Sequence, residues 1–308
     1  MNSDRLANFI IAGVNKAGST SLFHYLSEHP EVCGSRDKET CYFLPLLYGK
    51  TPGPIAEYAA QFTGCNNNKY LMEATPAYFF GKEKIAHAIK ETLGPVKVLI
   101  ILKDPVERLI SFYKRKKATF QLPSHIDLKE YVEKCLAKSK HDLEKQEHQI
   151  FTGISLGYYD EYINPWFDTF GNQLKVVFFD DLVKHPRNFM KDICSWLEID
   201  DSFYDEYAFT VRNRSLEYRN APIQKLAVKA NKAGQAFWRS NPQIKQRLLT
   251  LYYKFNGKPF DKNSINPIVV NFLKKHFKPH NQRLHHILSE QGITKMPEWL
   301  AEHELEHA

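Results

Sequence analysis

A glycine-bearing turn between an apolar run and a helical pattern constrains this chain more than any other stretch. Residues 13–22 read GVNKAGSTSL, follow the apolar run 9–12 and lead into an amphipathic segment. A strand, such a turn and a helix N-terminus form an anion cradle, because the backbone N–H groups of the turn and the helix dipole point at one place. The segment therefore predicts a site for a phosphate-sized group.

The lysine of this turn does not occupy the position that it has in NTPases. In the NTPase pattern the lysine directly follows the second glycine and precedes a serine or threonine. Here Ser19 follows Gly18, and Lys16 comes two residues before that glycine. We therefore expect a phosphate-like ligand without the NTPase arrangement of lysine and Mg²⁺.

The composition is that of a globular protein with an anionic ligand. The 308 residues are 43% hydrophobic and 25% charged, and the formal net charge is +7. No long stripe of lysine and arginine alternates with aromatic residues, so nucleic acid is not an expected partner. Apolar runs stay well short of the ~18 residues that a membrane-spanning helix needs, so no membrane span is expected.

The cysteines and the N-terminus predict a cytoplasmic protein. Five cysteines, at positions 33, 41, 65, 135 and 194, are odd in number and lack CxxC or CxxH spacing. This pattern argues against a zinc site and a disulfide framework, and it is typical of a reducing compartment. The polar residues 1–8 have no signal-peptide pattern.

Strand and helix patterns alternate along the first two thirds of the chain. Buried strands are predicted at 9–12, 69–72, 97–102 and 175–179. Helices are predicted at 20–28, 82–92, 106–118, 126–138, 156–169 and 186–197, then at 222–238, 242–255 and 267–289. Residues 45–68 predict a surface excursion. We expect one α/β domain over 1–308, with a central parallel sheet flanked by helices and a helical C-terminal third from about 200.

A second strand-to-helix junction offers a second anion site. The run 97–102 feeds into a helix start at which Asp104 takes the N-cap, Pro105 the first helical position and Glu107 the first turn. Two such junctions predict a ligand with phosphates at both ends.

Several blocks, in order along nearly the whole chain, resemble those of sulfotransferases that use 3′-phosphoadenosine 5′-phosphosulfate (PAPS). Residues 16–22 resemble the 5′-phosphosulfate loop and residues 99–113 the 3′-phosphate motif. Further blocks are similar to the heparan-sulfate-type branch: 38–43, 73–78, 178–182, 213–219 and 276–284. The resemblance implies a P-loop-like sulfotransferase fold, PAPS as the donor and no metal requirement.

The resemblance also assigns roles to individual residues. Lys16 would neutralise the leaving phosphate, and Glu39 would be the base that takes the acceptor proton. The 5′ end would be surrounded by Ala17, Gly18, Ser19, Thr20 and Ser21. The 3′-phosphate would be held by Lys103 and Ser111, and one of Arg214 and Arg219 would reach the donor. Lys103 stands where most members have arginine, and it lacks the bidentate fork.

The branch resembled favours a saccharide hydroxyl as the acceptor. A lipid, a polyketide or another small alcohol is the alternative, and N-sulfation of an amine stays open. Residues 73–76 read EATP where the branch has Glu-Lys-Thr/Ser-Pro, so Ala74 removes a cation that would contact a polyanionic sugar. A heparin-like acceptor is therefore less favoured than another saccharide.

Two other classes of function compete with this interpretation. A P-loop kinase or NTPase is one, because residues 176–180 read VVFFD and resemble a Walker B strand. A non-catalytic nucleotide binder of the same fold is the other, although Lys16 and Glu39 are both present. If a histidine were the base instead of Glu39, the nearest candidates would be His24, His141 and His148.

Overall fold

The computed structural model describes residues 5–210, 217–234, 237–238, 241–258 and 265–301. Contacts divide the chain into two compact units. The first unit comprises residues 1–104, 159–213 and 280–308, and the second comprises 105–158 and 214–279. The organisation of the chain as one domain stays a prediction.

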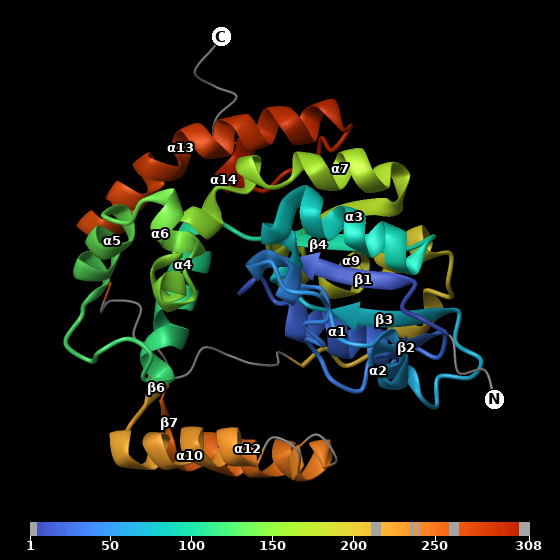
Figure 1. Cartoon of the computed structure of the whole chain (residues 1–308), viewed down its shortest axis with the longest axis horizontal. Coiled ribbons are helices and arrows are strands. Elements are labelled where there is room, and N and C mark those ends of the chain that lie inside the picture. The colour runs from blue at the N-terminus through green and yellow to red at the C-terminus, as the bar shows by residue number, and fades with distance from the viewer. Residues whose placement is uncertain (1–4, 211–216, 235–236, 239–240, 259–264, 302–308) are drawn as a thin grey trace. The chain divides into compact units, whose positions relative to one another are not determined.

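A five-stranded parallel sheet forms the centre of the first unit (Figure 1). Its strands are β1 (Phe9–Gly13), β2 (Val32–Gly34), β3 (Tyr70–Ala74), β4 (Lys97–Leu102) and β5 (Leu174–Phe178). They are ordered β2-β3-β1-β4-β5, and every neighbouring pair is parallel. Strand β1 is buried along its whole length, as the apolar run predicts. The predicted α/β fold with a parallel central sheet is confirmed.

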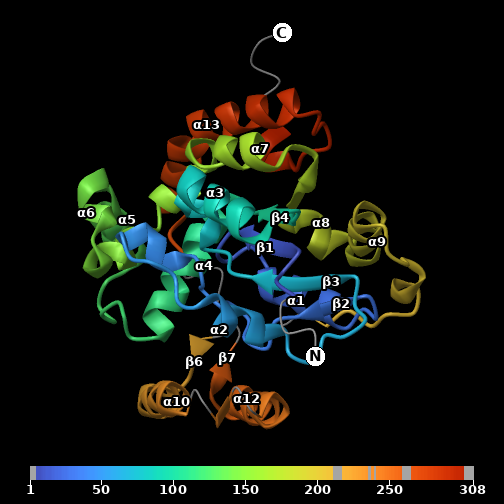
Figure 2. The same cartoon turned by 45° about the vertical axis from the view of Figure 1, so that its right-hand side comes forward.

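The helices of the first unit pack on this sheet through apolar pairs spaced four residues apart. They are α1 (Ser19–Ser27), α2 (Ile55–Ala59), α3 (Lys82–Leu93), α7 (Asn164–Phe170), α8 (Phe179–Lys184), α9 (Pro186–Leu197) and α14 (Glu298–Ala301). The shared core contains such pairs from three helices, namely Leu22 and Leu26, Ile85 and Ile89, and Ile193 and Leu197. Helices α3 and α7 lie side by side in both views (Figures 1 and 2).

The second unit is mainly helical and has a core of its own. Its elements are α4 (Pro105–Ala118), α5 (Leu128–Leu136), α6 (Lys140–Glu144), β6 (Glu217–Tyr218), α10 (Ala221–Ala233), α12 (Pro242–Asn256) and β7 (Gly257–Lys258). Strands β6 and β7 form an antiparallel ribbon. Helix α13 (Pro267–Glu290) gives Leu273 and Phe277 to this core and Leu284 and Leu288 to that of the first unit.

Three parts of the chain differ from the predicted elements. Strand β2 has only three residues, which is too short for a periodic signal. The helix predicted over 156–169 is wrong in its first half, because residues 155–161 form short 3₁₀ turns and α7 begins at Asn164 with Pro165 in its first turn. The excursion 45–68 contains α2 and buries Tyr58 and Phe62.

The prediction that the cysteines form no disulfide is wrong. Cys33 and Cys65 are joined, with their Cα atoms 5.8 Å apart. Cys33 lies on β2 and Cys65 follows residues 60–62, so the bond closes the loop that contains α2. The pair could not be predicted from the sequence, because the two cysteines are 32 residues apart and become neighbours only in the folded unit. The cytoplasmic location stays a prediction and loses the support of unpaired cysteines.

Reduction of this disulfide should destabilise the first unit. A closed loop of 32 residues restricts the unfolded chain, so Cys33→Ser/Cys65→Ser should lower the free energy of unfolding by about 3 kcal/mol in urea titrations. Thiol titration of the denatured, unreduced protein should count the three free cysteines. A count of five thiols, with no effect of dithiothreitol on the urea midpoint, would contradict the pairing.

Within the described ranges, no helix combines the length and the apolar character that crossing a membrane requires.

Candidate active site

The predicted residues of the first unit follow the carboxyl ends of neighbouring parallel strands. Lys16 follows β1, Lys103 follows β4 and Glu39 follows β2. The carboxyl ends of parallel strands share one edge of the sheet, which is where open α/β sheets bind ligands. The chain crosses from β3 past β1 to β4, so the β1 and β4 ends flank the point where the direction of winding changes.

The turn after β1 is held in a conformation that presents backbone N–H groups. Lys16 has φ of 72° and Gly18 has φ of 85°, both in the left-handed region. The Val14 N–H donates to the Ile101 carbonyl of β4 at 2.9 Å, and the Ala17 N–H donates to the Val14 carbonyl at 3.3 Å. Successive residues of mixed handedness form the concave nests that bind anions.

Helix α1 begins with a glycine at its N-cap. Gly18 provides no side-chain cap, and the first turn contains no acidic residue. Ser19, Thr20 and Ser21 lie inside the helix instead of capping it. The interpretation of these three residues as mere N-caps is therefore wrong. The helix dipole is not offset by an acid at this end, which favours an anionic ligand.

Close packing against α8 requires glycine at position 18. A Cβ atom on Gly18 would lie 2.8 Å from two ring carbons of Phe179 and 3.2 Å from Leu182. The same Phe179 ring lies 4.2 Å from the Lys103 ammonium, a cation–π distance. The Lys103 carbonyl accepts a hydrogen bond from the Tyr159 hydroxyl at 2.8 Å. Phe179 thus lies against both Lys103 and the turn of residues 14–18, which we call the phosphate turn.

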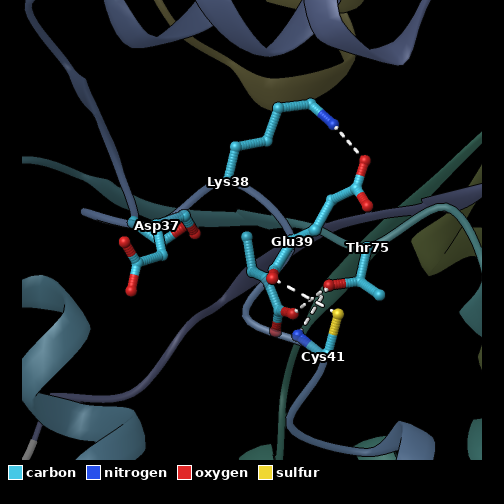
Figure 3. A network of polar contacts seen from close by, with 7 residues as sticks. Asp37, Lys38, Glu39, Cys41 and Thr75 are labelled. Carbon is cyan, nitrogen blue, oxygen red and sulfur yellow. Dashed lines mark hydrogen bonds and ion pairs between the residues drawn. The ribbon is translucent and has the colours of Figure 1, made fainter. Parts of the chain in front are cut away.

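Glu39 lies on a loop that is tied to the end of β3. Its N–H donates to the Ala74 carbonyl at 3.0 Å, and Ala74 pairs with Ile11 of β1. The backbone of Glu39 is therefore anchored at the strand next to the one that carries the phosphate turn. The Glu39 side chain is 54% exposed, and its carboxylate meets the Lys38 ammonium at 3.0 Å (Figure 3). An exposed, oriented carboxylate can reach an acceptor hydroxyl.

A buried carboxylate, that of Glu73, is the centre of the hydrogen bonds that fix this loop. Glu73, on β3, is fully buried. Four hydroxyl groups donate to it: those of Tyr58 at 2.6 Å, Tyr78 and Thr75 at 2.7 Å, and Thr40. These hydrogen bonds satisfy both oxygens of the buried carboxyl group. Burial, followed by the negative charge of Glu73, raises the pKa of Tyr58 and of Tyr78 well above the ordinary value.

The same hydroxyl groups accept hydrogen bonds from the backbone of the Glu39 loop. The Cys41 N–H donates to Thr75 Oγ1 at 3.2 Å (Figure 3), the Tyr42 N–H to Thr40 Oγ1 at 3.3 Å and the Phe43 N–H to the Tyr78 hydroxyl at 3.2 Å. Glu39 and Cys41 have φ of 66° and 58°. Left-handed non-glycine residues persist where the surroundings fix them, often at functional sites.

Local sequence patterns predict neither the hydrogen-bond cluster around Glu73 nor the contacts of Phe179 with Gly18 and Lys103. Glu73 was only part of a motif, and its partners Thr40 and Tyr58 lie 33 and 15 residues away. No local periodicity connects such positions. The cluster of hydroxyl-bearing residues around 40, 58, 75 and 78 becomes informative only once the sheet register is known.

Three predicted donor-binding residues, Ser111, Arg214 and Arg219, belong to the second unit. Ser111 is half-buried on α4 of the second unit. Arg219 belongs to the same unit, is exposed, and donates its backbone N–H to Asn256 at 2.8 Å. Arg214 lies outside the described residues. The roles of all three stay predictions. Arg108, which the sequence does not place in the site, is fully buried in the second unit and donates to the Gly153 carbonyl.

The features that suggest a kinase or a histidine base have other partners. The Trp299 indole donates to Asp180 Oδ2 at 3.3 Å, so the acid of the Walker B-like run connects α8 to α14. His148 bonds the Asp142 carbonyl through Nδ1 at 3.0 Å in the second unit. Among the described residues, no three His, Cys, Asp or Glu side chains group as metal ligands.

Comparison with known proteins identifies the family of this chain. The profile of the sulfotransferase domain matches residues 6–221. The chain belongs to the sulfotransferase domain family. Relatives include the mouse heparan sulfate glucosamine 3-O-sulfotransferase 3B1, 25% identical over 83% of this chain and 63% of the relative. A membrane-associated sulfotransferase of Dictyostelium discoideum is 36% identical over 35% of this chain and 22% of its own length.

The relatives are longer than this chain. The bovine bifunctional heparan sulfate N-deacetylase/N-sulfotransferase 2 is 24% identical over 99% of this chain, which spans 32% of that relative. Among solved structures, a sulfotransferase from Alicyclobacillus acidocaldarius superposes with a TM-score of 0.58 at 23% identity, covering 75% of this chain and 92% of the other. That likeness supports the fold.

Loss of a hydroxyl group that donates to the Glu73 carboxylate should lower the free energy of unfolding more than loss of one that donates to a neutral carbonyl. Tyr58→Phe should lower the free energy of unfolding by about 1.5–3 kcal/mol, because the acceptor is a buried carboxylate. The control Tyr70→Phe, whose hydroxyl donates to the Leu197 carbonyl at 2.9 Å, should cost about 1 kcal/mol. Urea titration measures both. Equal losses would show that Glu73 gains no special stabilisation from Tyr58.

The Cys41 thiol should resist alkylation at neutral pH. Burial and then the carboxylates of Glu39 and Glu73 raise the pKa of Cys41 to about 11 from 9.0. Its thiolate is scarce below that pH, so iodoacetamide labelling, followed by mass spectrometry of the Cys41 peptide, should accelerate up to about pH 11. In Glu39→Gln the midpoint should fall, because one carboxylate is neutralised. A wild-type midpoint at the ordinary thiol value would refute this environment.

Proposed function

We propose that this chain transfers a sulfuryl group from PAPS to a hydroxyl group of a saccharide. The observation that carries the proposal is the set of groups at one edge of the sheet. A phosphate turn with Lys16 lies beside Lys103 through the Phe179 ring, and the Glu39 loop is tied to the adjacent strand. Two cations suit a donor with separate phosphates, and the carboxylate suits a base.

The residues of the turn fit a phosphosulfate. The left-handed turn leads directly into the N-terminus of α1, where the first backbone N–H groups of a helix are available to an anion, and the absence of a side chain on Gly18 keeps the turn against Phe179. Lys16 would hold the negative charge that develops on the 5′-phosphate, and Lys103 would hold the 3′-phosphate. When bound, PAPS supplies the sulfuryl group and a good leaving group.

The acceptor would be activated by Glu39. The carboxylate takes the proton of the acceptor hydroxyl as the oxygen attacks sulfur, and the ion pair with Lys38 keeps the carboxylate oriented. The hydroxyl shell of Glu73 fixes the backbone from which Glu39 projects. Such fixed geometry matters because misplacement by about 1 Å can cost about 100-fold in rate.

The relatives support a saccharide acceptor. Two of them carry names that specify heparan sulfate, one as a 3-O-sulfotransferase and one as an N-sulfotransferase. In this chain Ala74, at the end of β3, stands where the heparan-sulfate-type branch has a lysine. A saccharide of lower negative charge therefore fits this chain better than a heparin-like polymer.

Transfer assays with radiolabelled PAPS and a panel of neutral and sulfated saccharides test the proposal. Glu39→Gln should lower turnover by about 100- to 10,000-fold, because it removes the base, while the affinity for the product 3′,5′-ADP stays that of the wild type. Lys16→Ala should lower turnover by about 100- to 1,000-fold, because its charge acts on the transition state.

Glu57→Gln, which neutralises an exposed glutamate of α2, is the matched control and should keep full activity. Wild-type turnover in Glu39→Gln would exclude Glu39 as the base. No transfer to any saccharide, with transfer to a lipid or small alcohol, would overturn the acceptor assignment while preserving the donor.

A further inference from the structure

The segment between β6 and β7 forms a helical hairpin with an unusual charge. We call residues 217–258, which contain α10 and α12, the basic hairpin. Strands β6 and β7 join its two ends, and α10 and α12 lie side by side (Figures 1 and 2). From residue 218 to 260 the sequence has nine lysines and arginines and no aspartate or glutamate. The chain as a whole carries a net charge of only +7, so positive charge is concentrated here.

The hairpin is tied together at its base by buried polar contacts. Asn256 is buried, accepts the Asn220 N–H at 2.8 Å and donates to the Asn220 carbonyl at 3.2 Å. It also donates to the Tyr252 hydroxyl at 2.8 Å, and that hydroxyl bonds Gln224 of α10. These hydrogen bonds hold the start of α10 and the end of α12 together.

Helix α12 exposes an apolar stripe along one face. Ile244, Leu248, Leu251 and Phe255 are 45%, 48%, 52% and 73% exposed. Their spacing of four, three and four residues places them on one face of the helix. Arg247 and Lys254 are exposed and lie about 70–90° round the helix axis from the centre of this stripe, on one flank. On α10, Leu226 is 69% exposed.

We propose that the basic hairpin docks the protein on an anionic lipid surface. A helix with an exposed apolar face and flanking cations lies in the bilayer interface, with the apolar face among the acyl chains and the cations at the headgroups. Phe237, which is 52% exposed between the two helices, adds an aromatic residue of a kind found on the apolar face of interfacial helices.

The positive charge and the apolar stripe together favour an anionic lipid surface over other binding partners. A second copy of the chain, paired about a two-fold axis, would bring the nine like charges against themselves. An anionic polysaccharide would use the cations but would leave the isoleucine, leucine and phenylalanine side chains in water. Only a surface that is both anionic and apolar uses both features.

Flotation of the full chain with vesicles tests this docking. Wild-type protein should float with vesicles of phosphatidylcholine and phosphatidylglycerol and far less with phosphatidylcholine alone, and high salt should weaken binding. Leu248→Asp/Leu251→Asp should bind at least about tenfold more weakly, because it removes the apolar contact. Arg247→Gln/Lys254→Gln should bind about 25-fold more weakly at low salt, since each cation contributes about fivefold.

Leu136→Asp changes an exposed leucine of α5 in the same unit and is the matched control. It should bind like the wild type. Circular dichroism and stabilisation by 3′,5′-ADP show that each variant is folded. No flotation of the wild type, or equal flotation of all variants, would overturn the proposal. So would a dimer in lipid-free solution that Leu248→Asp/Leu251→Asp dissociates, or binding to heparin beads without binding to vesicles.

Discussion

The buried carboxylate of Glu73 is the interaction on which the geometry of the site depends. A charge in a protein interior is costly unless hydrogen bonds satisfy it. Four hydroxyl groups satisfy this one, and three of them accept N–H groups from the loop after Glu39. Hydrogen bonds to this polar network thus fix the backbone conformation of the loop. The exposed Glu39 side chain therefore projects from a backbone of fixed position.

The parallel sheet explains why residues from distant parts of the chain act together. Strand order β2-β3-β1-β4-β5 places the ends of β1 and β4 side by side, and Phe179 at the end of β5 contacts both the glycine of the phosphate turn and Lys103. The aromatic ring therefore packs against both Gly18 and Lys103. Lys16 and Lys103, which we propose bind the donor, therefore lie close to strand ends, which vary less in position than surface loops do.

The sequence predicted the elements of the fold that have local signals. The apolar runs and the glycine-bearing segment located four strands, the turn between β1 and α1, and the start of α4, because periodicity and turn chemistry are local properties. The disulfide between Cys33 and Cys65, the hydroxyl shell of Glu73 and the contact of Phe179 with Gly18 join segments far apart in sequence. Such contacts depend on strand order, which hydrophobic patterns do not specify.

Binding of nucleotides tests the central claim most directly, because the site is assigned to a doubly phosphorylated adenosine and not to ATP with Mg²⁺. Calorimetry of the full chain with 3′,5′-ADP in the absence of metal should show binding that Lys16→Ala and Lys103→Ala each weaken. ATP with Mg²⁺ should bind more weakly than 3′,5′-ADP. Tighter binding of ATP with Mg²⁺, or affinity for 3′,5′-ADP that neither variant changes, would contradict the account.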